Sequence, residues 1–252
     1  MIKLISSGIC HSQLHQMHDY NLPKPFLLGH EATGVVMKTG PDCNYVQEGD
    51  YVIATWVRRN PIKGRYLPDL KGVSYQEKKL NCRITFTWSE IIMSEDEYIV
   101  KIPKKYATPE SCIVGCSILT GAGAVKNTAK VKPGETVAIF GVGGIGLAAV
   151  KMASLLNASK IIAIDIDSEK LEFSKQFGAT HTINSIENNP IDEIIDLTNG
   201  GVDYAFDAIG KKITMNQIFE SIKQGGSGAD NVGGTSILIG IPESPEITLD
   251  SN

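Results

Sequence analysis

The stretch Thr136-Val137-Ala138-Ile139-Phe140-Gly141-Val142-Gly143-Gly144-Ile145-Gly146 decides the fold of the second half of this 252-residue chain. Its first five residues are a continuous apolar run, which is typical of a parallel strand buried on both faces. In the Gly-x-Gly-x-x-Gly spacing that follows, Gly141 permits a tight turn, Gly143 lets the backbone approach a pyrophosphate, and Gly146 lets helix and strand pack closely. Gly144 begins the helix, whose unpaired N–H groups and positive dipole end attract phosphate. The stretch therefore predicts a dinucleotide-binding strand, turn and helix.

Strands and helices alternate on both sides of this stretch from about residue 117 onward. Further strands are predicted at 160–165, 181–183, 202–206 and 235–239. Helices are predicted at 144–156 and 168–178, the second with Ser168 as its cap. The pattern predicts an α/β fold with a doubly wound parallel sheet, of which five of the usual six strands are present.

An acidic residue, Asp165, ends the second strand, 19 residues after Gly146. A carboxylate at this place can hold both hydroxyls of an adenosine ribose and repels a 2′-phosphate. The sequence therefore predicts NAD rather than NADP as the cofactor.

Three potential metal ligands, Cys10, His30 and Cys116, lie far apart in the rest of the chain. Each alone is weak evidence, because a cysteine is usually a small buried apolar residue. Two thiolates and one imidazole leave a tetrahedral zinc ion with one open position, as a catalytic zinc requires. Zinc together with a dinucleotide predicts hydride transfer to or from an alcohol carbon.

The composition excludes several other classes of protein. A net charge of −4 without a basic cluster argues against nucleic acid as a partner. No apolar run approaches the roughly 18 residues that a membrane span needs, and residues 1–8 lack the pattern of a signal peptide. Five cysteines without dense spacing argue against a disulfide framework. We expect a cytoplasmic protein whose thiolates are free to bind metal.

Residues 1 to about 116 are predicted to form short β segments, including 34–37, 50–54 and 94–102, separated by Gly, Pro and Asn turns. With the cysteine, histidine and glycine motifs, the chain resembles the zinc-dependent medium-chain alcohol dehydrogenases over almost its whole length. The resemblance implies a smaller, incomplete GroES-like β-barrel catalytic domain over 1–116 and a Rossmann NAD-binding domain over 117–252. It also implies truncation at both ends: the opening barrel strands are missing, as is the last Rossmann strand, which often makes the dimer contact in this usually homo-oligomeric family.

The same resemblance implies roles for five further residues. Ser12 occupies the position of a hydroxyl beside the reacting alcohol, and His15 that of a histidine that passes the proton to solvent. His11 matches a position near the cofactor pyrophosphate, and Lys170 matches a lysine that touches the adenosine ribose. Glu31 matches a glutamate that sits behind the metal.

Two positions depart from the family pattern. Gln13 stands where relatives usually have an aspartate that accepts the N–H of the metal-bound histidine. Its amide oxygen can accept this bond without negative charge, so we expect a more electrophilic and less tightly held zinc. The stretch 56–88, where many relatives bind a structural zinc through four cysteines, contains only Cys82, which excludes a structural Cys₄ zinc. Cys112, four residues before Cys116, is expected to pack in the core.

The leading prediction is a zinc- and NAD-dependent oxidoreductase that interconverts a primary alcohol, or an alcohol adduct, and the aldehyde. Cys116, in place of an acidic ligand, favours the alcohol branch over the polyol branch. Residues 115–116, 120–121 and 127–131 resemble the alcohol and S-(hydroxymethyl)glutathione dehydrogenases about equally. The alternative from another class is a truncated, non-catalytic remnant that binds nucleotide at most.

Overall fold

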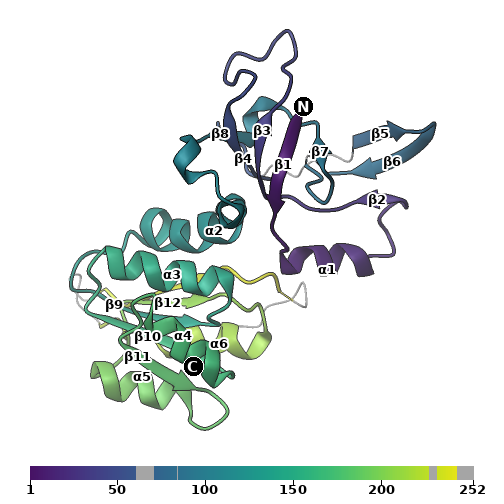
Figure 1. Ribbon diagram of the computed structural model, residues 1–252. Coiled ribbons are helices and arrows are strands. Elements are labelled where there is room, and N and C mark those ends of the chain that lie inside the picture. Colours follow the sequence, from purple (N-terminus) through teal and green to yellow (C-terminus); the bar gives the residue numbers. More distant parts are fainter. Residues whose placement is uncertain (61–70, 84, 227–231, 243–252) are drawn as a thin grey trace. The chain divides into compact units, whose positions relative to one another are not determined.

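The computed structural model describes residues 1–60, 71–83, 85–226 and 232–242. The chain divides into two compact units, Met1–Ser117 and Ile118–Asn252. Figure 1 shows the ribbon of both units. Each unit has β-sheet structure and an apolar core of its own. In the part of the chain that is described, no helix is long and apolar enough to cross a membrane.

The first unit is built mainly from short strands. They are β1 (Ile2–Ser7), β2 (Phe26–Leu27), β3 (Ala32–Val36), β4 (Tyr51–Ala54), β5 (Lys71–Tyr75), β6 (Lys78–Cys82), β7 (Ile91–Ile92) and β8 (Ile99–Lys101). One sheet has the order β7-β1-β3-β4-β8 and is antiparallel throughout. A second sheet has the order β2-β6-β5. The larger sheet buries Ile2, Val52 and Ile99 in one apolar cluster.

Short helices connect these strands and end the unit. They are α1 (His11–His18) and the 3₁₀ helices η1 (Asp96–Tyr98), η2 (Lys104–Tyr106) and η3 (Pro109–Gly115). Helix α2 (Ser117–Gly123) begins at the last residue of the unit. The strand predicted at 94–102 is therefore wrong over its first half. There the N–H of Tyr98 donates to the carbonyl of Glu95 at 3.2 Å, which closes a turn before β8 begins.

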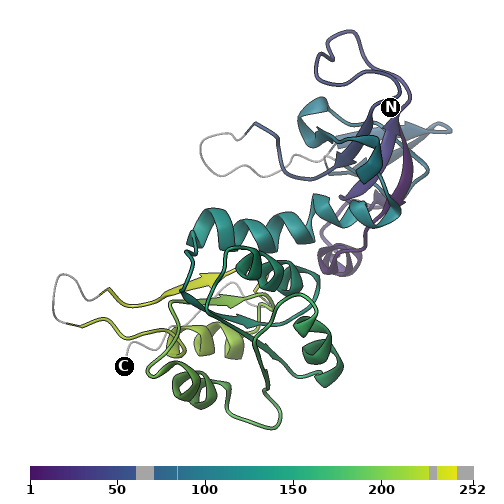
Figure 2. The ribbon, with the colours of Figure 1, turned by 60° about the vertical axis from the view of Figure 1, so that its left-hand side comes forward.

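The second unit holds a parallel sheet of order β11-β10-β9-β12-β13, seen from another side in Figure 2. Its strands are β9 (Thr136–Phe140), β10 (Lys160–Asp165), β11 (His181–Asn184), β12 (Tyr204–Asp207) and β13 (Thr235–Leu238). Numbered along the chain, the order is 3-2-1-4-5, which is the strand order of the Rossmann fold. The predicted α/β class with a doubly wound sheet is confirmed.

Helices cover both faces of this sheet, which explains the apolar run in β9. The helical segments are the π-helix η4 (Ala124–Ala129), α3 (Gly144–Leu155), α4 (Ser168–Lys175), α5 (Pro190–Thr198) and α6 (Lys212–Glu220). Val137 and Ile139 share a cluster with residues of α3, whereas Ala138 and Phe140 pack with residues of α5 and α6. Successive residues from Val137 to Phe140 thus meet different helical layers, so none of these four is polar.

The predicted cap of α4 is wrong by one residue. The carboxylate of Asp167, and not the hydroxyl of Ser168, accepts hydrogen bonds from the N–H groups of Glu169 and Lys170. A carboxylate suits this place because it also meets the positive end of the helix dipole.

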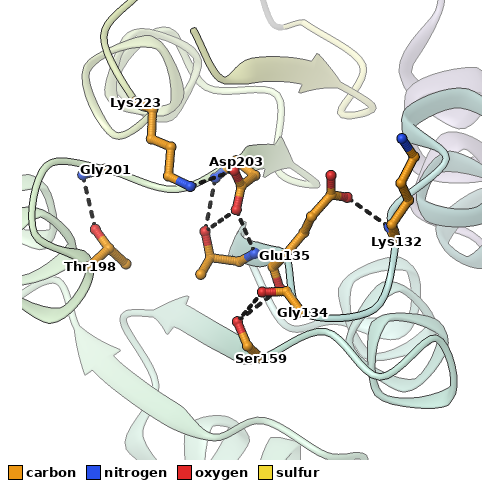
Figure 3. A network of polar contacts seen from close by, with 9 residues as sticks. Lys132, Gly134, Glu135, Ser159, Thr198, Gly201, Asp203 and Lys223 are labelled. Atoms are coloured by element: carbon orange, nitrogen blue, oxygen red, sulfur yellow. Dashed lines mark hydrogen bonds and ion pairs between the residues drawn. The ribbon is translucent and has the colours of Figure 1, made fainter. Parts of the chain in front are cut away.

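A polar network joins the starts of the central strands β9 and β12 (Figure 3). These starts lie at the end of the sheet opposite the glycine loop. Oδ2 of Asp203 accepts from the N–H and the hydroxyl of Thr136 at 2.8 and 2.7 Å. Its Oδ1 accepts from Nζ of Lys223 at 2.5 Å. Because Thr136 begins β9 and Asp203 directly precedes β12, the network holds the starts of the two central strands together.

Candidate functional site

The three predicted metal ligands stand at the ends of secondary-structure elements in the first unit. Cys10 is the N-cap of α1, where the chain turns after β1. His30 comes two residues before β3, and Cys116 lies between η3 and α2. Gly29 has φ +92°, and a Cβ there would lie 2.5 Å from Oγ1 of Thr87. The chain before His30 therefore requires glycine.

The structure brings these three ligands together. One ligand atom from each of Cys10, His30 and Cys116 lies within 4.8 Å of the other two. The two sulfur atoms are 3.8 Å apart. A tetrahedral zinc with Zn–S bonds of about 2.3 Å separates two sulfur ligands by about 3.8 Å. The spacing of the thiols therefore fits zinc.

The histidine of the cluster is oriented for a ligand. Nδ1 of His30 lies 2.7 Å from the side-chain nitrogen of Gln13. Its other ring nitrogen, Nε2, is buried and has no hydrogen-bond partner among the described residues. A buried polar nitrogen without a partner is rare in a folded protein, and beside two thiols it is the group that a zinc ion satisfies.

A hydrogen bond from Cys116 to Cys10 couples the two thiols. The hydrogen bond from Cys116 to Cys10 lowers the pKa of Cys10, with smaller contributions from His30 and Ser12, against burial, which raises it. The same bond, together with burial, raises the pKa of Cys116. The site therefore carries a thiolate at neutral pH, and thiolate is the form that binds metal.

Glu31, predicted to sit behind the metal, is buried directly after His30, with 2% of its surface exposed. Burial raises the pKa of this carboxyl group to about 7, and the nearby imidazole of His30 lowers it by less. A Cβ at Gly8 would lie 2.5 Å from the carboxyl group. Because Gly8 has no side chain, the carboxyl group of Glu31 fits beside it.

The predicted proton-path residues lie on α1. The hydroxyl of Ser12 donates to Sγ of Cys10 at 3.3 Å, so the structure joins Ser12 to the cluster. The rings of His11 and His15 lie 5.2 Å apart and are exposed. In the described part of the chain, no hydrogen bond links either of these two histidines to the ligands. Cys112 is buried and is not part of the cluster.

Trp56 is a neighbour of the cluster that the sequence analysis missed. Its ring centroid lies 6.3 Å from that of His30, and its side chain lowers the pKa of Cys116 against the larger effects that raise it. Of its surface, 44% is exposed. Its position two residues after the strand predicted at 50–54 is the available signal, since residues that follow a strand end often line sites. Trp56 forms an apolar wall beside the cluster.

The glycine stretch in the second unit has the predicted conformation. Gly141 has φ +87°, which favours glycine. A Cβ at Gly146 would overlap the carbonyl oxygen of Gly141, whereas one at Gly143 would meet no atom within 4 Å. Gly143 caps α3 and Gly144 begins it. The backbone therefore faces open space where the helix N–H groups begin, which fits a bound phosphate.

Asp165 is held at the end of β10 by backbone N–H groups. Its Oδ2 accepts from Val142 at 2.9 Å, and its Oδ1 accepts from Ile166 and Asp167 at 2.8 and 3.1 Å. Lys170, on α4, lies 3.7 Å from a carboxylate oxygen of Asp167. The structure thus brings the glycine loop and Asp165 into direct contact.

A cysteine–histidine cluster and a Rossmann glycine loop in one chain define a zinc-binding, dinucleotide-dependent dehydrogenase. The family model described as "Alcohol dehydrogenase GroES-like domain" matches residues 1–104, and "Zinc-binding dehydrogenase" matches residues 144–251. The chain therefore belongs to the zinc-dependent medium-chain alcohol dehydrogenase family, a family of NAD-dependent oxidoreductases. The predicted resemblance is confirmed.

Individual relatives agree with this assignment. Alcohol dehydrogenase class-3 of Oryza sativa subsp. japonica is 34% identical, over 96% of this chain and 69% of the relative. The Pisum sativum protein of the same name is 35% identical over the same shares. Benzyl alcohol dehydrogenase from Acinetobacter calcoaceticus superposes with a TM-score of 0.85 at 28% identity, over 99% of this chain and 72% of that one.

Proposed function

We propose that this chain transfers hydride between NAD and a primary alcohol or alcohol adduct, forming the aldehyde. The observation that carries the proposal is the convergence of Cys10, His30 and Cys116 around a buried ring nitrogen without a partner among the described residues. In this proposal residues 1–116 are the zinc-binding catalytic domain and residues 117–252 bind NAD. Free thiolates suit a reducing compartment, so we place the protein in the cytoplasm.

One zinc ion is held by Cys10, His30 and Cys116, and no structural zinc is bound. When bound, zinc acts as a Lewis acid on the alcohol or aldehyde oxygen. The chain's own residues orient the reaction: Gln13 fixes the ring of His30, and Trp56 excludes water from one side. Glu31 adds a carboxyl group behind the ligands.

Two side chains of α1, Ser12 and His15, carry the proton of the alcohol to solvent. The hydroxyl of Ser12 is close enough to the cluster to accept a proton from a substrate oxygen and to donate its own. His15, one helical turn further along α1, then passes the proton to solvent. An imidazole suits this role because its charge changes near neutral pH.

NAD binds to the glycine loop. The N–H groups at the start of α3 bind the pyrophosphate beside Gly141, Gly143, Gly144 and Gly146. Asp165 binds the adenosine ribose. His11 adds a hydrogen-bonding group at the pyrophosphate, and Lys170 adds a positive charge at the ribose.

We propose the substrate only to the level of a primary alcohol. A second candidate is S-(hydroxymethyl)glutathione, because residues 115–116, 120–121 and 127–131 resemble that branch and the alcohol dehydrogenase branch about equally. Activity toward ethanol, hexanol, benzyl alcohol and S-(hydroxymethyl)glutathione, followed as NADH formation by the purified chain, tests both. Turnover that a zinc chelator abolishes supports the proposal. Binding of NAD without turnover of any of these alcohols supports the non-catalytic remnant instead.

A further inference from the structure

The amide of Gln13 faces a nitrogen of each of two metal ligands at once, the backbone N–H of Cys10 and Nδ1 of His30. Its oxygen accepts from the backbone N–H of Cys10 at 3.3 Å, and its nitrogen lies 2.7 Å from Nδ1 of His30. The side chain is 1% exposed, so water does not replace either contact. Any effect of this amide on zinc rests on the proposed function, in which the cluster holds the metal.

The orientation of this amide selects one neutral form of His30. An amide NH₂ group donates, so the Nδ1 that it faces must accept and carries no proton. A neutral imidazole then carries its proton on Nε2, the buried ring nitrogen that does not face Gln13. A metal needs Nε2 free of its proton, and the ring then carries the proton on Nδ1. The metal-free arrangement therefore favours the form of His30 that does not bind metal.

Metal binding creates a conflict that the amide cannot resolve. Once Nδ1 of His30 carries a proton, it and the N–H of Cys10 are two donors facing Gln13. An amide has one acceptor oxygen whichever way round it is placed. Turning the amide over supplies the oxygen to His30 and leaves its NH₂ group against the N–H of Cys10. A carboxylate has two acceptor oxygens and satisfies both donors.

We propose that Gln13 is a positioning residue that couples zinc binding to inversion of its own amide and to a proton shift between the ring nitrogens of His30. The coupling weakens zinc binding, because one buried donor is left unpaired when the metal is bound. Partners of a metal-bound histidine change metal affinity by about 10- to 100-fold. A carboxylate at position 13 should therefore raise the affinity for zinc by a factor of this size.

Two measurements on the full chain test the proposal. The first is NMR of protein labelled with ¹⁵N-histidine, which locates the ring proton of neutral His30 with and without zinc. The second is zinc affinity, by competition with a chromophoric chelator, for the wild type, Gln13→Glu and Gln16→Glu. Gln16 lies on the same helix, so its variant adds the same charge, and in the described part of the chain no hydrogen bond joins its side chain to His30.

We expect the proton on Nε2 in the metal-free wild type and on Nδ1 after zinc is added. Gln13→Glu should carry it on Nδ1 even without metal and should bind zinc about 10- to 100-fold more tightly, with Gln16→Glu close to the wild type. A proton on Nδ1 in the metal-free wild type overturns the proposal, and so does a Gln13→Glu affinity no higher than that of Gln16→Glu. The wild-type spectrum tests the position of the His30 ring proton even where a variant fails to fold.

Failure of the proposed function gives a different result. A wild type that binds no zinc, or binds zinc without turnover, contradicts the proposed function, whereas the metal-free spectrum still reports the position of the His30 proton. Zinc binding by Gln13→Glu alone would support the role of Gln13 and contradict a zinc-dependent wild-type enzyme.

Discussion

The backbone N–H of Val142 donates to Oδ2 of Asp165 at 2.9 Å. This bond ties the glycine loop to the end of the neighbouring strand, so the carboxylate has a structural partner besides any ribose. With N–H groups of Ile166 and Asp167 on its other oxygen, Asp165 is held in one orientation. A ribose-binding carboxylate is most selective when it is fixed in this way.

Replacement of Asp165 by glycine should shift the preference from NAD toward NADP. The variant loses the carboxylate that binds the ribose hydroxyls and repels a 2′-phosphate, so the ratio of kcat/KM for NADP to that for NAD should rise about tenfold or more. Asp196→Asn, at an exposed position of α5, is the charge control. An unchanged ratio in Asp165→Gly would remove the ribose role.

Two glycines of the loop should respond differently to alanine. Gly143→Ala adds a methyl group in open space, so the folding stability should stay unchanged while the Kd for NAD rises about tenfold or more, because the methyl group lies where the pyrophosphate binds. Gly146→Ala places its Cβ against the carbonyl of Gly141 and should destabilise the protein by about 1–3 kcal/mol. Thermal unfolding of both variants measures the loss of stability, and NAD titration measures the loss of cofactor binding. An equal loss of stability in both variants would contradict the different roles of the two glycines.

The sequence predicts the second unit better than the first for a physical reason. The strand at 160–165 is found with its predicted bounds, because a strand buried on both faces has an uninterrupted apolar run. Short strands with one exposed face carry a weaker signal, and the sequence predicts strand at Asp96–Tyr98, where the structure has a helical turn. The place of Trp56 beside His30 depends on two segments 26 residues apart coming together, which no local pattern reports.

The orientation of the Gln13 side chain is likewise not reported by any local sequence pattern. The sequence indicates that position 13 is the partner of a metal-bound histidine. It does not indicate that the amide nitrogen faces His30 while the oxygen faces Cys10, because that choice is made by the packing of α1 against the chain before β3.

His15→Ala should slow alcohol oxidation mainly at low pH. Without the imidazole the proton must leave directly to solvent, and this step recovers as hydroxide becomes available at higher pH. We expect kcat to fall by about tenfold or more near pH 6 and to approach the wild type near about pH 9. His18→Ala is the matched control, since His18 lies on the same helix with its Nδ1 against the carbonyl of Leu14. A uniform loss at every pH would exclude the relay role.

Asp203→Asn should reduce stability in a pH-dependent way. Burial raises the pKa of Asp203, but hydrogen bonds from Lys223 and Thr136 outweigh burial, so the net shift is downward. A depressed pKa means that the ionised form stabilises the fold above the unfolded pKa of about 3.9, and that this stability is lost as pH falls through the lower folded value.

Urea denaturation checks this prediction. At pH 7 the free energy of unfolding of Asp203→Asn should be lower than that of the wild type by roughly 1–3 kcal/mol. The difference should shrink as the pH falls from about 5 to about 3. A difference that is the same at both ends of this range would show that the carboxylate charge is not what stabilises the start of the sheet.

The zinc content of the purified chain tests the central claim most directly, measured by elemental analysis on the wild type, Cys116→Ser and Cys112→Ala. Cys112 is buried close by in the chain but lies outside the ligand cluster, which makes it the matched cysteine control. We predict about one zinc per chain in the wild type and in Cys112→Ala, and a loss of most of it in Cys116→Ser. Equal zinc in all three, or a folded wild type without zinc, would contradict a catalytic site formed by Cys10, His30 and Cys116.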